Sequence, residues 1–352
     1  MLLSYRSLKL FKYFYSHFFA LLLILNTTSL LAFESASWLE DIDNLRFAID
    51  MSARGQYNIN SNHLSNIDSL GLDLHKVFTL SDGRDIATLV FQGYLTKLVN
   101  VEKYPSFYKD KDDLKFICRI CNINFSLLDR GALNIRIGHF ETPFGLEYNL
   151  DTNGTLRQYS NGRDLGGKLD WGMAFNGKAS WGGGYELAFS RGSGVDWSDN
   201  YSTYIISGRV EKTFGYSSFL GFSTFYGYLT MPNTKNYIDR TRIGLDGNTQ
   251  VGPLAVLGEF SIGKDDDTEL INSLFEMNIQ NNTEKLLGYF QFKTTSHQFI
   301  NESWDTMLQS SLGVRYTPDR NWVLSGQWTY DIKAYELVKR ASSLGIQVRY
   351  RF

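Results

Sequence analysis

The sequence predicts an all-β protein, a transmembrane antiparallel β-barrel of about 16 strands that follows a cleaved signal peptide. Apolar and polar residues alternate along most of the chain with a period of two, and the connections between the alternating runs are short and long in turn. The 352 residues include 25 Phe, 21 Tyr and 7 Trp, yet after the N-terminus no apolar stretch approaches the roughly 18 to 20 residues that a spanning helix needs.

The N-terminal residues indicate export. A start that carries three basic residues precedes an apolar core at 18–25, and Ala32 offers a small residue for cleavage. The core is too short to span a membrane, which disfavours a retained anchor helix. We therefore expect a signal peptide at 1–32, a short periplasmic segment at 33–44 and the barrel at 45–352.

The charge balance excludes one class of partner. Cleavage after Ala32 removes three positive charges and no negative ones, so the formal net charge goes from −2 to −5. An acidic exported chain lacks the basic stripe that nucleic-acid phosphates require, and we expect no nucleic-acid partner.

The first expected strand shows the alternation clearly. In 45–57, Phe47 and Ile49 share the apolar face, whereas Asp50 and Arg54 share the polar one. Further strands are expected near 69–78, 86–98, 114–127, 133–140, 168–176, 185–191, 203–213, 219–229, 238–248, 251–262, 269–279, 284–294, 307–316, 322–332 and 341–352.

The connections supply an independent test, because transmembrane barrels alternate short periplasmic turns with longer external loops. Short connections are expected at 80–85, 128–132, 177–184, 215–218, 249–250, 280–283 and 317–321. Longer ones fall between them, among them 58–68, 99–113, 141–167 and 263–268. The alternation requires a strand at 269–279, which gives an even count with both termini on the periplasmic side.

The chain ends on LGIQVRYRF, an alternating strand with Phe352 as its last residue. We expect this strand to pair with the first one and so remove both sheet edges. Phe352 would then belong to the interfacial aromatic girdle and serve as a recognition tag for the barrel-assembly machinery.

The two cysteines, Cys118 and Cys121, form a C-x-x-C element. A redox pair or half of a zinc site is the functional interpretation. However, extended residues three apart lie about 10 Å from each other, beyond the roughly 7 Å limit for a disulfide, and no second ligand pair follows at zinc spacing. The apolar phase flips between Phe116 and Ile123, which predicts a β-bulge. We expect neither a metal ion nor a cofactor.

The segment IRIGHFETPFGLEY carries a Gly–aromatic–x–x–Pro–x–Gly element with Gly138, Phe140, Pro143, Gly145 and Glu147. The stretches 163–177, 185–196 and 240–263, the last with Gly252, Pro253 and Glu259, agree with the same family pattern. With these motifs the chain resembles the phosphate-selective porin (O/P type) family over residues 40–352. The resemblance implies a sixteen-stranded outer-membrane channel, commonly trimeric, with one loop folded into the pore. The family's arginine ladder and lysine cluster have no residue-by-residue counterpart here.

The loop at 141–167 is the expected constriction, since long loops without regular structure are usually functional or disordered. It contains Glu141, Glu147, Arg157, Arg163 and Asp164. In one interpretation Arg157 and Arg163 face acidic residues across an eyelet, where a transverse field orients polar solutes. In the other, the loop is solvated and lies over the barrel mouth.

Other lumen candidates come from the strands. Alternation places Arg136 on the lumen face, as well as Arg240 and Arg242, which are stacked along the pore. The last two either guide anions or pair with a wall carboxylate such as Glu259 on the next strand. The acidic runs at 109–113 and 264–267 lack the ligand spacing of a calcium loop and are expected to be solvated.

No Ser, His and carboxylate set stands at a recognisable spacing, and we expect no enzyme. The leading hypothesis is a porin of the bacterial outer membrane that conducts small hydrophilic solutes or ions, including anions such as phosphate. Its partners would be outer-membrane lipid, lipopolysaccharide and further copies in a homotrimer. The alternatives are a membrane-anchored barrel that acts as a surface hydrolase or adhesin through its loops, and a soluble secreted β-protein.

Overall fold

The computed structural model describes residues 44–101, 114–128, 131–150, 155–159, 165, 168–195, 202–215, 217–230, 237–299 and 302–352. Contacts divide the chain into two units, 1–46 and 47–352. The expected signal peptide and nearly all of the segment 33–44 lie outside the described residues, as do Arg163, Asp164 and the acidic run at 109–113.

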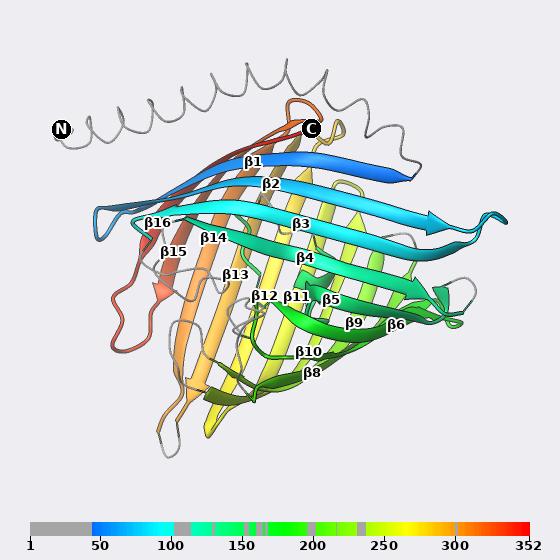
Figure 1. Ribbon diagram of the computed structural model, residues 1–352. Helices are drawn as coiled ribbons and strands as arrows, with labels where there is room; N and C mark the ends of the chain where they lie inside the picture. The colour runs from blue at the N-terminus through cyan, green and yellow to red at the C-terminus, as the bar shows by residue number, and fades with distance from the viewer. Residues whose placement is uncertain are drawn as a thin grey trace. The chain divides into compact units, whose positions relative to one another are not determined.

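Sixteen antiparallel strands form a closed barrel in which each strand pairs with its sequence neighbours and β1 pairs with β16 (Figure 1). The expected strand count and antiparallel fold are confirmed. The strands are β1 Leu45–Asn58, β2 His63–Thr79, β3 Asp85–Val99, β4 Leu114–Ser126, β5 Asn134–Glu141, β6 Leu169–Ala179, β7 Gly183–Ser190, β8 Tyr204–Phe214, β9 Ser218–Thr230, β10 Tyr237–Val251, β11 Leu254–Asp265, β12 Thr268–Gln280, β13 Leu286–Gln298, β14 Asp305–Tyr316, β15 Trp322–Lys333 and β16 Ser342–Arg351.

Two expected long connections are wrong. The connection at 58–68 shrinks to a turn between Asn58 and His63, and the one at 263–268 to a turn between Asp265 and Thr268. Asn62 (φ 53°) and Asp266 (φ 48°) supply the left-handed backbone of these turns, which Asn and Asp tolerate better than most residues. The polar residues on either side of these turns therefore belong to the paired strands instead of forming loops.

Alternation sorts side chains into two faces, as β10 shows. Ile243 and Leu245 point outward and are 46% and 51% exposed. Arg242 and Asp246, which flank this pair in the sequence, point into the lumen and are 1% and 2% exposed. The outer surface is thus an apolar band and the lumen is polar, which is the arrangement of a transmembrane barrel. Among the described residues, no helix is long and apolar enough to cross a membrane.

The predicted bulge in β4 is confirmed. Gly93 pairs with Cys118 and Gln92 with Ile120, so Arg119 is the extra residue. Both cysteines are free thiols. The bulge directs the Arg119 guanidinium to Gln92 (2.9 Å) and to Glu141 at the end of β5 (3.0 Å).

The seam between the first and last strands is closed by backbone and by charge. Ile49 and Phe352 exchange backbone hydrogen bonds of 2.8 and 3.1 Å. In the lumen, the Arg349 Nε donates to the Asp50 Oδ1 at 2.8 Å across the seam. The Tyr94 hydroxyl on β3 lies 3.3 Å from Asp50 and 3.0 Å from Asp73 on β2. One hydrogen-bonded network therefore links β16, β1, β2 and β3.

We expect Asp50→Asn to destabilise the closed barrel by about 2 kcal/mol. The change removes the carboxylate that pairs with Arg349, and the loss stays below the roughly 3 to 5 kcal/mol of breaking a fully buried pair because 10% of the Arg349 side chain remains exposed. Urea unfolding of the protein in lipid vesicles, followed by tryptophan fluorescence, measures this.

The matched control is Asp82→Asn, because Asp82 pairs with Arg84 in an exposed turn where both side chains are at least half exposed. That change should alter stability by less than about 0.5 kcal/mol. Equal losses in the two variants would show that the seam network does not stabilise the barrel.

Candidate functional site

The connection between β5 and β6, residues 142–168, is here termed the inner loop. The structure describes its residues 142–150, 155–159, 165 and 168, including the short 3-10 helix η2 (Leu146–Asn149). The expected constriction segment, 141–167, therefore differs from the observed loop by one residue at each end. The described parts of the loop pack against the lumen wall.

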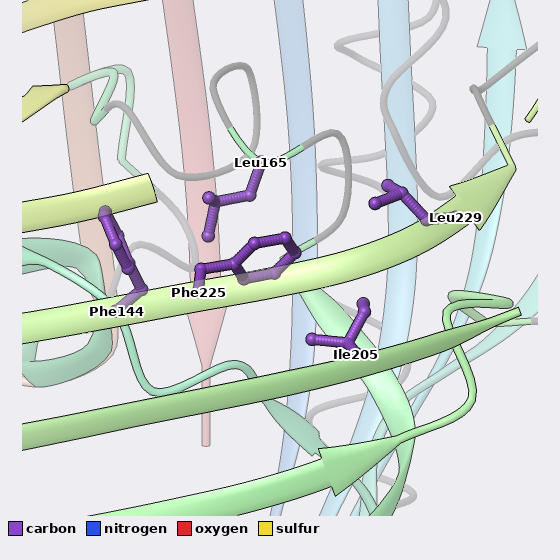
Figure 2. Packing of buried hydrophobic residues seen from close by; sticks show 5 residues of the cluster. All are labelled: Phe144, Leu165, Ile205, Phe225 and Leu229. Atoms are coloured by element: carbon purple, nitrogen blue, oxygen red, sulfur yellow. The ribbon is translucent and has the colours of Figure 1, made fainter. Parts of the chain in front are cut away.

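Apolar side chains near the two ends of the loop pack against the inner face of the barrel. Phe144 and Leu165 are fully buried against Ile205, Phe225 and Leu229, which point inward from β8 and β9 (Figure 2). Each buried side chain of this size contributes roughly 1.5 to 3 kcal/mol of transfer free energy. These apolar wall positions therefore explain why the loop folds inward.

A second apolar cluster holds the middle of the loop. Leu146 and Tyr159 pack against Leu257 on β11 and Leu274 on β12. Because the two clusters involve β8, β9, β11 and β12, the loop is fastened to one side of the lumen wall.

Backbone groups of the loop are satisfied by wall side chains. The Leu146 N–H donates to the Glu259 carboxylate at 2.7 Å, and the Gly145 N–H donates to the Ser223 hydroxyl at 3.1 Å. The Arg209 Nε donates to the Gly145 carbonyl at 3.2 Å. Gly145 has φ 63°, a left-handed conformation that favours glycine and that turns the loop toward the wall.

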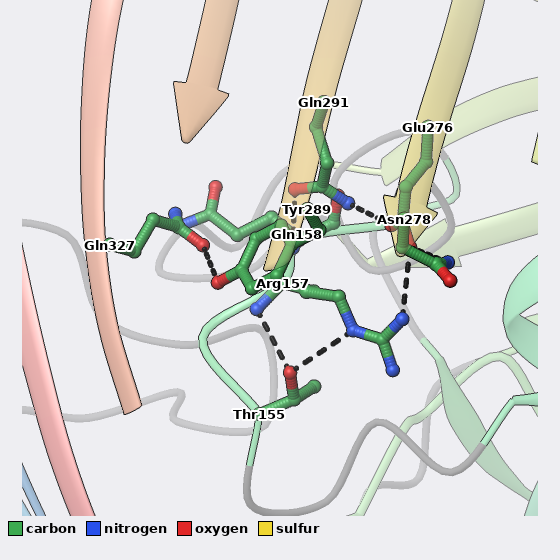
Figure 3. Close-up of polar contacts among 8 residues, drawn as sticks. All are labelled: Thr155, Arg157, Gln158, Glu276, Asn278, Tyr289, Gln291 and Gln327. Atoms are coloured by element: carbon green, nitrogen blue, oxygen red, sulfur yellow. Dashed lines mark hydrogen bonds and ion pairs between the residues drawn. The ribbon is translucent and has the colours of Figure 1, made fainter. Parts of the chain in front are cut away.

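Side chains of the barrel wall, Gln291 among them, hydrogen-bond the backbone of the segment 155–159 (Figure 3). The Gln158 N–H donates to the Gln291 side-chain oxygen at 3.2 Å, and the Gln291 Nε2 donates to the Gln158 carbonyl at 3.3 Å. The Arg54 Nη2 on β1 donates to the Thr155 carbonyl at 2.8 Å. The loop therefore reaches from the β12–β13 wall to β1.

Arg157 is the loop's buried cation. Its Nη1 donates to the Glu276 carboxylate at 2.9 Å, and its guanidinium lies 5.8 Å from the ring centre of Tyr159 and 5.9 Å from that of Tyr289. Burial by itself lowers the pKa of Arg157, but Tyr159 and Glu276 outweigh it and raise the pKa above its ordinary value. Arg157 therefore stays charged at any pH that the fold tolerates.

Two more arginines converge on the same place. Arg54 and Arg315 both interact electrostatically with Tyr289, as Arg157 does, and Arg315 also interacts with Arg157. In the part of the chain that the structure describes, neither Arg54 nor Arg315 has a carboxylate partner. Arg54, Arg157 and Arg315, here termed the arginine cluster, thus share Tyr289 as a neighbour, and of the three only Arg157 is paired with a carboxylate, Glu276, among the described residues.

Two of the predicted acidic residues, Glu141 and Glu147, are paired with basic side chains. Lys168 lies 3.3 Å from Glu141 and 3.1 Å from Glu147, and Arg119 also pairs with Glu141. Arg136 pairs with Glu186 at 3.2 Å, and the Tyr148 hydroxyl of the loop donates to the same carboxylate. Burial raises the pKa of Tyr148, so this hydroxyl keeps its proton.

Arg240 and Arg242 both bind Asp265, with Nη–Oδ distances of 2.6 and 2.8 Å. The carboxylate that the sequence suggested for them, Glu259, instead accepts the Leu146 N–H. The reason is register: Arg240 lies opposite Asp265, whereas Glu259 lies opposite Asp246. These two arginines belong to the wall near the β11–β12 turn.

Sequence reasoning placed Arg54 on the polar face but did not single it out, because only the folded loop brings it together with Glu276 and Arg315. It also missed Arg119. The signal for Arg119 was present, since it shares parity with the lumen positions that precede the phase flip in β4. Among the described residues, no cluster of His, Cys, Asp and Glu could hold a metal ion.

A closed barrel with an apolar exterior, a polar lumen and a loop fastened inside it has the architecture of a transmembrane β-barrel. OprB of Pseudomonas putida is similar to the chain, with a TM-score of 0.66 at 10% identity over 88% of this chain and 94% of that one. The anion-selective porin from Comamonas acidovorans is similar with a TM-score of 0.63 at 12% identity, over 88% of this chain and 99% of that one. A trimer form of OmpT, an outer membrane protein of Vibrio cholerae, is similar with a TM-score of 0.60 at 14% identity, over 88% of this chain and 99% of that one.

At such identities the likeness establishes the fold, that of outer-membrane porins and channels. No protein-family model matches the chain, and no curated protein matches it.

We expect Gly244→Leu to expel the inner loop from its seat on the wall. A Cβ at Gly244 would lie 2.8 Å from the Phe144 ring, so a leucine cannot coexist with the first apolar cluster. In the wild type Arg157 is nine-tenths buried in the lumen and should resist trypsin; in the variant, cleavage after Arg157 should appear. Limited proteolysis with mass spectrometry locates the cut.

Gly258→Leu on neighbouring β11 is the control, because the nearest atom to a Cβ there is a carbonyl oxygen at 3.9 Å. It adds the same side chain and should leave Arg157 protected. Protection of Arg157 in both variants would show that Phe144 does not hold the loop.

Proposed function

We propose that the protein is a porin, a water-filled channel for the passive diffusion of small hydrophilic solutes across the bacterial outer membrane, with a preference for anions. The arginine cluster carries this proposal. Selectivity is set at the narrowest part of a pore rather than by the sum of its wall charges. The inner loop narrows this lumen, and the cluster at its edge holds three cations against one carboxylate.

Several other charges of the described lumen wall are paired. Arg209 pairs with Glu211 and Asp246, Arg136 with Glu186, and Arg349 with Asp50. Paired charges orient water but repel neither sign of ion strongly. An anion in the pore therefore meets its main attraction at Arg54 and Arg315.

Inorganic phosphate is one anion that fits this chemistry. Guanidinium groups present planar, paired donors that match phosphate oxygens. The similarity to an anion-selective porin supports the sign of the preference, and the resemblance in sequence to phosphate-selective porins supports phosphate as a substrate. No covalent step is part of the proposal.

The apolar outer surface supports the proposed placement of the barrel in the outer membrane. The apolar band faces outer-membrane lipid and lipopolysaccharide, and the end that carries both termini faces the periplasm after removal of residues 1–32. At that end Phe352 stacks near Tyr350, which contacts Trp322, as an aromatic girdle and a recognition element for the barrel-assembly machinery. A homotrimer is the proposed assembly.

The first experiment is single-channel conductance of the purified protein in a planar bilayer, with a salt gradient that yields the reversal potential. Discrete steps and a reversal potential on the anion side support the proposal. Discrete conductance steps without ion preference would support a channel but contradict the anion preference. A folded, inserted but silent barrel contradicts it and favours a loop-based hydrolase or adhesin.

Neutralising the arginine cluster should weaken the anion preference. We expect Arg54→Gln and Arg315→Gln each to lower the anion-to-cation permeability ratio by about fivefold, because a unit charge a few ångströms away in water contributes on the order of 1 kcal/mol. Glu276→Gln should raise the ratio. The reversal potential under the same gradient measures all three.

Arg84→Gln serves as the control, since Arg84 lies in an exposed turn with 65% of its side chain accessible. It removes one positive charge and should leave the ratio unchanged. An identical ratio in the wild type and both cluster variants would remove the cluster from the selectivity mechanism.

A further inference from the structure

Two hollows in the lumen flank Tyr148 of the inner loop. The first has a volume of about 570 Å³ and lies toward β3 and β4; the second, of about 430 Å³, lies toward β6, β7 and β8. Both are lined by Arg136 and Tyr148, so the two hollows adjoin at these residues. Each falls within the roughly 300 to 1,000 Å³ of small-molecule sites.

Four side-chain amides contribute to the polar lining, beside ionisable side chains that are for the most part paired. Asn122, Asn124, Asn134 and Asn176 come from three consecutive strands, β4, β5 and β6. The Asn176 Nδ2 donates to the Asn124 Oδ1 at 3.1 Å, and the Asn134 Nδ2 donates to the Asn176 Oδ1 at 3.1 Å. This chain of amides fixes the orientation of its members.

The ends of that chain remain available. Within the described part of the chain, the Asn124 Nδ2 and the Asn134 Oδ1 have no hydrogen-bond partner. The Asn124 Nδ2 is a donor and the Asn134 Oδ1 is an acceptor. The other polar atom of each side chain is already hydrogen-bonded to Asn176. A solute that carries hydroxyl groups can both accept from the first and donate to the second.

The hollows carry almost no uncompensated charge. Arg136 is paired with Glu186, and Glu141 is paired with Arg119 and Lys168. Arg209 and Glu211, which also line the second hollow, are paired with each other, and Lys178, exposed near the β6–β7 turn, adds a charge at its rim. The hollows therefore differ from the arginine cluster, where cations exceed carboxylates.

Apolar surface completes the lining. Val90, Ile120, Phe140 and the Tyr148 ring face the first hollow. Neutral amides beside apolar and aromatic surface suit a solute that has hydroxyl groups along its edges and C–H groups on its faces. Those are the features of a pyranose sugar, and they are absent from an inorganic anion.

We propose that the hollows beside Tyr148 form a low-affinity binding site for neutral polyhydroxylated solutes of the size of a mono- or disaccharide. The inference rests on the proposed channel function and adds a second solute class to it. Anions are attracted by the arginine cluster, whereas a sugar is held by the amide chain on β4–β6 during its passage.

Glucose and maltose are the probes, added to an open channel in a planar bilayer at constant salt. We expect each to reduce the ion current in a saturable manner. Polyethylene glycol of matched hydrodynamic radius should reduce it only in proportion to concentration. The double variant Asn124→Leu/Asn176→Leu should raise the half-saturating sugar concentration by about tenfold, as expected for the loss of one to two hydrogen bonds.

The matched control is Gln309→Leu, which replaces an amide on the lumen face of β14. It should leave the half-saturating sugar concentration unchanged. If the double variant does not insert, the single variant Asn124→Ser, which shortens the side chain without adding apolar volume, replaces it with the same expected direction. Unaltered half-saturation in an Asn124 variant overturns the proposed site.

Identical effects of sugar and matched polyethylene glycol on the wild type also overturn the inference. In that case the channel still conducts and the proposed function stands. The absence of any conductance step, by contrast, removes the proposed function itself, so the two failures are distinguishable.

Discussion

Closure of the β1–β16 seam is the constraint on which the rest of this structure depends. In a bilayer every backbone N–H and C=O needs a partner within the protein, and a sheet achieves this only when its first and last strands pair. Here the pairing runs from Asp50 with Arg351 to Asn58 with Ser343. Once the ring is closed, alternation leaves no freedom: each side chain faces either the apolar exterior or the lumen.

The lumen is then divided by the inner loop. Its seat combines inward apolar residues such as Phe225 and Leu257 with wall groups that satisfy loop backbone, such as Glu259 and Gln291. Apolar burial gives the loop its affinity for the wall, and the hydrogen bonds fix its register. Because both are distributed over β8 to β13 and β1, the loop presents one edge to the remaining water path.

That edge brings two chemistries into one pore. The arginine cluster lies where the loop meets β12 to β14 and β1, and the asparagine chain lies on β4 to β6 beside Tyr148. In the proposed channel, long-range attraction by charge and short-range contact by amides would act on different solutes, so the channel would discriminate by charge and by hydroxyl pattern.

The sequence by itself determined the strand count, the antiparallel order, the lumen face and even the bulge at Arg119, because these follow from a period of two and from its single phase flip. It misjudged the connections after Asn58 and Asp265, where left-handed Asn62 and Asp266 make tight turns from polar residues that resemble loop. Only the tertiary structure decided that the inner loop enters the barrel, that Arg157 meets Arg54 and Arg315, and that Glu259 serves the loop rather than Arg240. Those contacts join residues up to hundreds of positions apart around the barrel, and local alternation assigns a face to a side chain but not its partner across the lumen.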